Sequence, residues 1–113
     1  MALNREAILS ASDLRREEVK VPEWGGSVFV RTMTAFEQNA YYQRIADDKS
    51  SDMNVMLEFL CNVVCDENGN RILKEDDIDA LYAKSFSAIN RLLKEAMRIN
   101  NLTQDAEEEL EKN

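Results

Sequence analysis

The segment DENGNRILKEDD, residues 66–77, has the residue spacing of a calcium-binding loop. Asp66, Asn68 and Asn70 stand at its first, third and fifth positions. Asp77 closes it at the twelfth position. An EF-hand loop takes oxygen ligands from these positions, turns the chain with a glycine at position six and binds the ion with a bidentate glutamate at position twelve. Calcium binding is therefore the first chemistry to test.

Three residues of this segment work against calcium. Arg71 stands where the loop needs glycine, and a residue with a side chain disfavours the positive φ of that turn. Lys74 adds a second positive charge, and Asp77 is too short for bidentate binding across the loop. Alternatively, the Asn-Gly pair at 68–69 favours a tight chain reversal, and the carboxylates at 75–77 favour a helix start. We expect the turn, with no metal and no other cofactor.

The remaining reactive side chains form no familiar catalytic set. Cys61 and Cys65 lie four apart in a helical pattern, where they are poorly placed for a mutual disulfide. The sequence has no histidine, which zinc sites and general acid–base catalysis most often use. Its three glycines form no phosphate-binding loop. We expect two small buried thiols and a protein that is not an enzyme.

The composition limits the class of partner. A chain of 113 residues, 44% of them hydrophobic, forms one domain with a modest core. Its net charge of −8 repels the phosphates of nucleic acids. No apolar run reaches the ~20 residues that cross a bilayer, and the N-terminus lacks the pattern of a secretory signal. We therefore expect a soluble, cytoplasmic protein that binds other proteins, with no nucleic acid and no membrane among its partners.

The N-terminal third predicts a short helix and then a β-hairpin. Residues 4–12 favour a helix that Asn4 can cap. Residues 17–33 alternate between apolar and polar around the turn Pro-Glu-Trp-Gly-Gly, which is typical of a hairpin. Pro22 confines its strand to a sheet edge or a strand end. Trp24 either covers the edge of the core or stays exposed as an anchor for a partner.

Two helices are expected next. The Thr-x-x-Glu pattern at 34–37 is a capping box that starts a helix ending near residue 46. Its expected inward residues are Phe36, Ala40 and Tyr41. Residues 47–52 are polar and form a connector, whose last member, Asp52, can cap a third helix over residues 53–65.

The third helix is apolar on two sides. One face follows the helical period and consists of Met53, Met56, Leu57, Leu60, Cys61 and Val64. A second stripe consists of Val55, Phe59 and Val63. A helix that is apolar over so much of its circumference must be covered on both sides. It is either the central helix of a small bundle, or its second stripe is an oligomer or client surface.

The C-terminal part predicts a short helix over residues 76–85 and a longer one over 85–100. The expected inward face of the longer helix consists of Phe86, Ile89, Leu93, Ala96 and Met97. Its basic residues Arg91, Lys94 and Arg98 either bind an acidic partner or form a solvated face. Residues 103–113 form an acidic tail that we expect to be flexible. The fold class is mainly α with a small N-terminal β-hairpin (α+β), a compact helical bundle of four to five helices over residues 1–102.

Four motifs resemble those of the tail assembly chaperones of long-tailed bacteriophages and prophages. They are the VPEWGG hairpin at 21–26, the D-x-x-G turn at 66–73, the acidic DI-x-x-L helix at 76–81 and the closing N-x-L at 100–102. Where the family often has Thr or Ser before the acidic helix, this chain has Lys74, which weakens that helix cap. The resemblance spans about residues 16–102 and rests on structural motifs, none of them catalytic.

The resemblance implies a function in virion assembly. Proteins of this family are understood to bind the long tape measure protein in the host bacterial cytoplasm, keep it soluble and help recruit tail tube subunits. They are absent from the mature virion. The family also suggests a longer product, made by ribosomal frameshifting, that recruits the tail tube protein. The closing Glu-Lys-Asn of this chain is compatible with an A-rich slippery run, so we predict such a product.

Other functions stay open on the sequence alone. A calcium-responsive or generic helix-binding adaptor module is the alternative to the chaperone, and a homo-oligomer is compatible with both. The residues expected to contact a partner are Trp24, Val55, Phe59, Val63, Arg91, Lys94 and Arg98.

Overall fold

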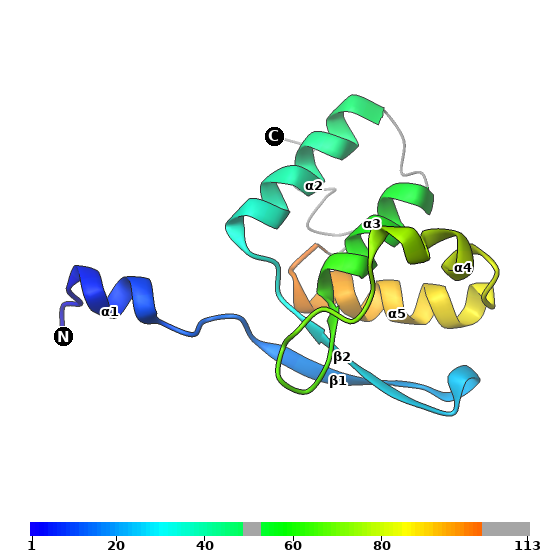
Figure 1. The fold of residues 1–113 in the computed structure, drawn as a ribbon, viewed down its shortest axis with the longest axis horizontal. Helices are drawn as coiled ribbons and strands as arrows, with labels where there is room; N and C mark the ends of the chain where they lie inside the picture. The colour runs from blue at the N-terminus through cyan, green and yellow to red at the C-terminus, as the bar shows by residue number, and fades with distance from the viewer. Residues whose placement is uncertain (49–52, 103–113) are drawn as a thin grey trace.

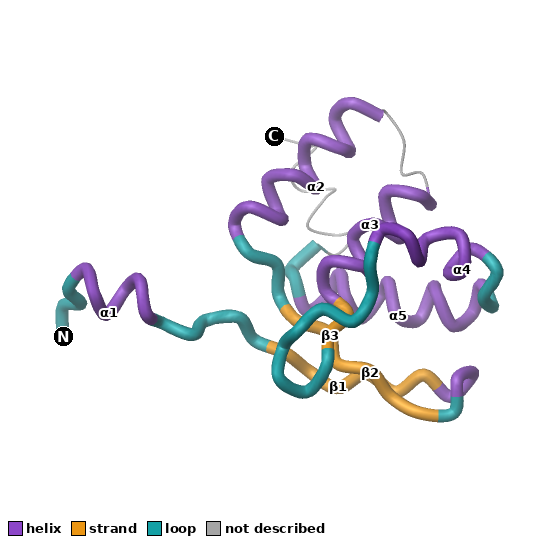
Figure 2. Tube along the Cα trace, in the orientation of Figure 1, coloured by secondary structure: helices purple, strands orange, loops and turns teal. Residues whose placement is uncertain are grey.

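The computed structural model describes residues 1–48 and 53–102, which form five α-helices, two short 3₁₀ helices and one three-stranded sheet (Figures 1 and 2). In chain order these are α1 (Arg5–Ser10), β1 (Arg16–Val21), η1 (Pro22–Trp24), β2 (Gly26–Arg31), α2 (Ala35–Asp48), α3 (Met53–Val63), β3 (Val64–Cys65), η2 (Glu75–Asp77), α4 (Ile78–Tyr82) and α5 (Phe86–Ile99). The predicted fold class, mainly α with an N-terminal hairpin, is confirmed. The expected cap at Asp52 and the expected tail at 103–113 lie outside the described residues.

The hairpin of β1 and β2 forms as the alternating pattern predicts. The strands are antiparallel, with Val19 opposite Val28. Pro22 follows the end of β1 and opens η1, so its missing N–H removes no bond from the strand ladder. Gly25 completes the turn with a φ of 74°, a conformation that residues with side chains rarely adopt.

The sheet has a third strand that the helical pattern did not predict. α3 ends at Val63, and Val64 and Cys65 pair with Val30 and Phe29 of β2. The expectation of a helix to residue 65 is therefore wrong. The edge of β2 offers backbone partners at this point, and both residues become almost fully buried there. Cys61 and Cys65 are free, buried thiols, and burial raises the pKa of each.

Helix α3 is the centre of the helical part. It contacts α2, α4 and α5, while α5 lies along β1 and β2 (Figure 1). Its buried residues are Val55, Leu57, Phe59, Leu60, Cys61 and Val63. Both stripes are therefore covered within the chain, which confirms the central-helix interpretation. The idea that the second stripe is left exposed as an oligomer or client surface is wrong.

Helix α2 begins at the predicted capping box. Glu37 N–H donates to Thr34 Oγ1 at 3.1 Å, and Thr34 N–H donates to Glu37 Oε1 at 3.0 Å. Tyr41 is buried, but Phe36, also expected to face inward, is 82% exposed. Five positions at about 100° per residue place these two side chains about 140° apart, so both cannot face α3.

Helix α5 supplies the other large part of the core. Its buried residues are Ala88, Ile89, Leu92, Leu93, Ala96 and Ile99. Phe86 was expected among them but is 67% exposed, because it stands at the rim of a recess between α3, α4 and α5. Ser85 caps the helix, accepting from Ala88 N–H.

Two buried polar clusters join the sheet to the helices, and the sequence pattern revealed neither. Arg31, at the end of β2, donates from Nη1 and Nη2 to the two carboxylate oxygens of Glu37, each at 2.9 Å. Their side chains are only 8% and 15% exposed. Asn100, after α5, accepts from Met33 N–H at 2.7 Å and donates to Arg31 O at 3.2 Å. These hydrogen bonds connect the segment between β2 and α2 to the C-terminal end of α5.

Candidate partner-binding site

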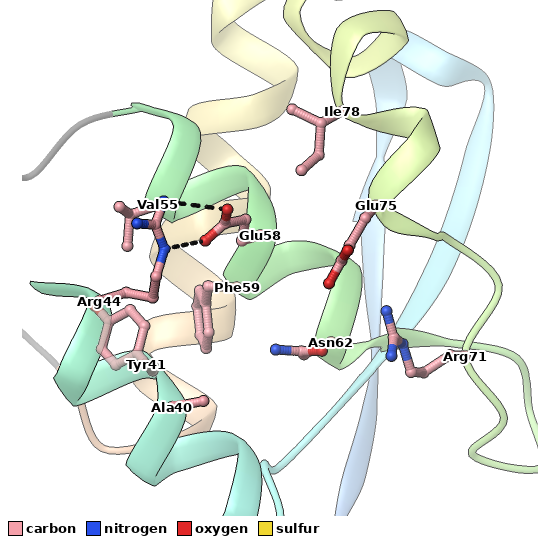
Figure 3. Close-up of a pocket in the computed structure, with 10 residues that line it drawn as sticks. All are labelled: Ala40, Tyr41, Arg44, Val55, Glu58, Phe59, Asn62, Arg71, Glu75 and Ile78. Carbon is pink, nitrogen blue, oxygen red and sulfur yellow. Dashed lines mark hydrogen bonds and ion pairs between the residues drawn. The ribbon is translucent and has the colours of Figure 1, made fainter. Parts of the chain in front are cut away.

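A groove of about 310 Å³ lies between α2 and the 71–78 segment, with α3 as its floor (Figure 3). Each of the three segments contributes several side chains. The lining residues are Ala40, Tyr41 and Arg44 from α2, Val55, Glu58, Phe59 and Asn62 from α3, and Arg71, Glu75 and Ile78 from the opposite wall. The groove therefore combines an apolar floor with charged walls.

The apolar floor comes from the second stripe of α3. Val55 and Phe59 are four residues apart, so they lie on one side of the helix. The rings of Phe59 and Tyr41 lie 5.3 Å apart between centroids and are tilted by 43°. This contact holds α2 against α3 at the base of the groove. Val55 and Phe59, which the sequence analysis proposed as partner contacts, therefore form the inner side of the groove. Val63, proposed with them, does not line the groove.

One charged wall is an ion pair between two helices. Arg44 Nε and Nη2 donate to Glu58 Oε2 and Oε1 at 2.9 and 3.2 Å (Figure 3). Their side chains are 43% and 31% exposed, so water screens the pair and it adds little to stability. Its larger effect is to fix one cation and one anion at the mouth of the groove.

The opposite wall is positioned by Arg71. Its Nε donates to Cys61 O at 2.9 Å, one of the last carbonyls of α3, which have no partner within the helix. Arg71 is also paired with Cys65 across an isolated β-bridge. Glu75 follows in the first turn of η2, so the wall carries charges of both signs.

The arrangement suits the binding of a protein segment better than chemistry at a small substrate. The partly exposed Ala40 and Ile78, above a buried apolar floor, can contact an apolar side chain of a partner, and the charges at the rim can pair with charges beside it. Within residues 1–48 and 53–102, no three His, Cys, Asp or Glu side chains are grouped to hold a metal ion. No helix of these ranges is long and apolar enough to cross a membrane.

Comparison with known proteins identifies the family. The family model for phage tail assembly chaperones matches residues 3–112. The chain belongs to this family. A similar solved structure, the tail assembly chaperone of bacteriophage HK97, is 19% identical, with a TM-score of 0.63 over 83% of this chain and 94% of that chain. A search of curated proteins gave no match. The resemblance inferred from the four motifs is therefore confirmed, and the solved structure shows that the fold is shared.

In this chaperone the segment 66–77 reverses the chain and starts a helix. Asp66 Oδ1 accepts from the N–H groups of Asn68 and Asn70, each at 2.9 Å, and these hydrogen bonds lower the pKa of its carboxyl. Gly69 makes the turn with a φ of 87°. Asp77 Oδ2 accepts from Lys74 N–H at 2.8 Å, so the helix start forms without Thr or Ser at position 74. The predicted turn is confirmed, and the carboxylates of Asp66 and Asp77 accept hydrogen bonds from backbone N–H groups.

The hairpin tip and the basic residues of α5 lie on another surface of the chaperone. Arg91 donates to both carboxylate oxygens of Glu23, at 3.3 and 3.2 Å, and a backbone hydrogen bond together with Arg91 lowers the pKa of that carboxyl. Arg98 pairs with Glu17 at 3.0 Å and with Glu95 at 2.8 Å. The two arginines therefore connect α5 to the hairpin, an arrangement that neither sequence interpretation included.

Two of the nominated contact residues remain accessible on that surface. Trp24 is 39% exposed, so its ring covers the hairpin only in part. Lys94 is exposed and has no ion pair with a described residue. The sequence gave no signal that Glu17 and Glu23 pair with α5, because their partners Arg98 and Arg91 lie 81 and 68 residues further along the chain. Only the docking of the helix on the hairpin brings these charges together.

Proposed function

We propose that this chaperone binds the tape measure protein of its phage through the groove between α2 and the 71–78 segment. It keeps that long chain soluble in the host bacterial cytoplasm and helps recruit tail tube subunits, acting by binding and not by catalysis. It leaves before the virion is mature. Family membership and the groove with its Phe59 floor support this proposal, and the groove is the observation that carries it.

The chemistry of the groove matches a helical client. A helix docks in a groove by placing apolar side chains three or four residues apart into it. Ala40 and Ile78, which are partly exposed above the buried Val55 and Phe59, offer apolar contact, while Arg44 and Glu58 offer a cation and an anion to polar residues beside the anchor. The net charge of −8 keeps a complex with an aggregation-prone chain in solution.

Filling the groove tests the proposal. Ala40→Trp places a large ring in the groove without removing a core side chain, because Ala40 lines it and is only partly buried. Ala46→Trp is the matched control, an exposed alanine of the same helix outside the groove. Each variant is expressed with a tagged tape measure protein from the same phage, and the captured chaperone is measured. We expect at least about tenfold weaker capture for Ala40→Trp only.

The two parts of the proposal fail in different ways. If the wild type is not captured and the tape measure protein is no more soluble with it, the function is wrong. If the wild type and Ala40→Trp are captured equally, the function stands and the groove is not the contact. Trp24→Ala, measured in the same way, tests the hairpin tip as a further contact.

The tail tube protein is proposed to join through a frameshift-extended form. The test is the nucleotide sequence that encodes the last residues. A slippery heptamer followed by an open overlapping frame is the expected result. Its absence removes the extended form from the proposal and leaves the groove unaffected.

A further inference from the structure

Residues 1–14 form an arm whose first part, with α1, stands away from the body of the chaperone, while residues 10–14 line a hollow with Arg31 and Asn68 (Figure 1). Every residue of the arm is exposed, and five of them are large and apolar: Met1, Leu3, Ile8, Leu9 and Leu14. α1 spans six residues and buries none, although Asn4 caps it by accepting from Ala7 N–H at 2.9 Å. Helices this short are marginal in water without a packing surface. The arm therefore needs an apolar surface that its own chain does not provide at that position.

A small apolar recess lies at the opposite end of the molecule from the arm. It is enclosed by α3, α4 and the start of α5, which Figure 1 shows far from α1 along the longest axis, of 48 Å. Its volume is about 130 Å³, and its lining residues are Met53, Leu57, Leu81, Tyr82, Lys84, Phe86 and Ile89. Phe86 and Tyr82 stand at its rim, 67% and 49% exposed.

The arm and the recess are complementary in size and charge. An apolar cavity of about 150 Å³ accepts a benzene molecule, so a recess of 130 Å³ takes one aliphatic side chain. Leu9 is the most exposed apolar residue of α1, and Glu6 lies three residues before it on the same helix surface. Lys84 lines the recess and supplies the opposite charge.

We propose that the arm of one copy docks in the recess of the next copy. The arm joins the body where Thr32 N–H donates to Arg15 O at 2.9 Å, and from there it points away from its own recess (Figure 1). Each copy carries its arm and its recess at opposite ends of the molecule, and the arm of one copy meets the recess of the next, which is a head-to-tail contact. Repeated head-to-tail contacts generate a ring or a filament. This contact is separate from the client groove, so it does not depend on the proposed function.

Two single variants and their mixture test the contact. Leu9→Asp removes the anchor of the arm, and Phe86→Asp alters the rim of the recess at the first position of α5, where an acidic residue suits the helix. Mass is measured by light scattering after gel filtration at tens of micromolar. We expect the wild type to form assemblies of more than two copies and each variant alone to be monomeric. A 1:1 mixture gives heterodimers, because the intact arm of the Phe86→Asp variant can dock only in the intact recess of the Leu9→Asp variant.

Controls keep the result specific. Phe36→Asp changes an equally apolar, 82% exposed residue outside both surfaces and leaves the assembly unchanged. Circular dichroism verifies the helix content of each variant. A Glu6→Lys change and a Lys84→Glu change each weaken the assembly, and the double variant restores it. A monomeric wild type, single variants that assemble as the wild type does, or a mixture that stays monomeric overturns the proposal.

Discussion

Removing the charge of Glu37 should destabilise this chaperone far more than removing an exposed charge. Glu37→Gln keeps an oxygen that accepts from Thr34 N–H but leaves the Arg31 guanidinium, 8% exposed, without its counter-ion. Breaking a buried ion pair in this way costs about 3–5 kcal/mol. We expect the lower end, about 3 kcal/mol, because the amide oxygen still accepts one hydrogen bond. A small domain has about 5–15 kcal/mol of stability in total, so this loss is large.

The assay is urea and thermal unfolding followed by circular dichroism. A loss of about 3 kcal/mol lowers the melting temperature by more than about 10 °C for a domain of this size. Glu17→Gln is the matched control, because Glu17 pairs with Arg98 on the surface, where side chains are 44% and 53% exposed. It should cost less than about 1 kcal/mol.

A double variant separates the ion pair from packing. Combining Arg31→Met with Glu37→Gln removes both charges at similar volume while the amide oxygen still accepts from Thr34 N–H, a change that is often close to neutral for a buried pair. The double variant should therefore be more stable than Glu37→Gln. If Glu37→Gln costs no more than Glu17→Gln, the buried pair does not hold β2 to α2 and the reasoning is refuted.

Four further outcomes are expected. Burial opposes ionisation of Glu37, but hydrogen bonds from Arg31 and Thr34 outweigh burial and lower the pKa of the carboxyl below 4.5. The ionised carboxylate therefore stabilises the fold fully above pH 4.5, and this stabilisation is lost as the pH falls through the folded pKa. Glu37→Gln should flatten that part of a pH–stability curve. Cys61 and Cys65 should react with a thiol reagent only on unfolding, because both are about 1% exposed; fast native labelling would contradict their burial. Gly69→Ala should cost about 1–2 kcal/mol in urea unfolding, because φ is 87° there; no loss would mean that the turn relaxes. Millimolar calcium should leave tryptophan fluorescence and the melting temperature unchanged, and a shift would restore the calcium hypothesis.

Much of the local structure was predictable because neighbouring residues decide it. The capping box at 34–37 fixes the start of α2 through hydrogen bonds within four residues. Gly69 sets the chain reversal by its own backbone conformation, and Pro22 sets the end of β1. The period of apolar residues in α3 also predicted a central helix, because a helix apolar on two sides has to be covered on both.

The misassigned residues each depend on a distant partner. Val64 and Cys65 continue a helical pattern, yet they pair with β2, because its unpaired edge satisfies their backbone groups. Phe36 is more apolar than Tyr41, yet it is exposed, because the two side chains point about 140° apart around α2 and only Tyr41 faces α3. The candidate groove likewise has no sequence signature, since its walls come from α2 and from the 71–78 segment, which α3 keeps apart.

The sequence by itself determined the family, the capped helices, the hairpin and the tight turn, because each is encoded in motifs or in contacts between residues close in the chain. Tertiary structure alone decided which charges pair. Arg31 with Glu37 is buried, whereas Arg91 and Arg98 bind Glu23 and Glu17 from across the fold. Charges act through space, so the packing of α5 and α2 on the sheet selects their partners and leaves the arm of residues 1–14 without a surface of its own.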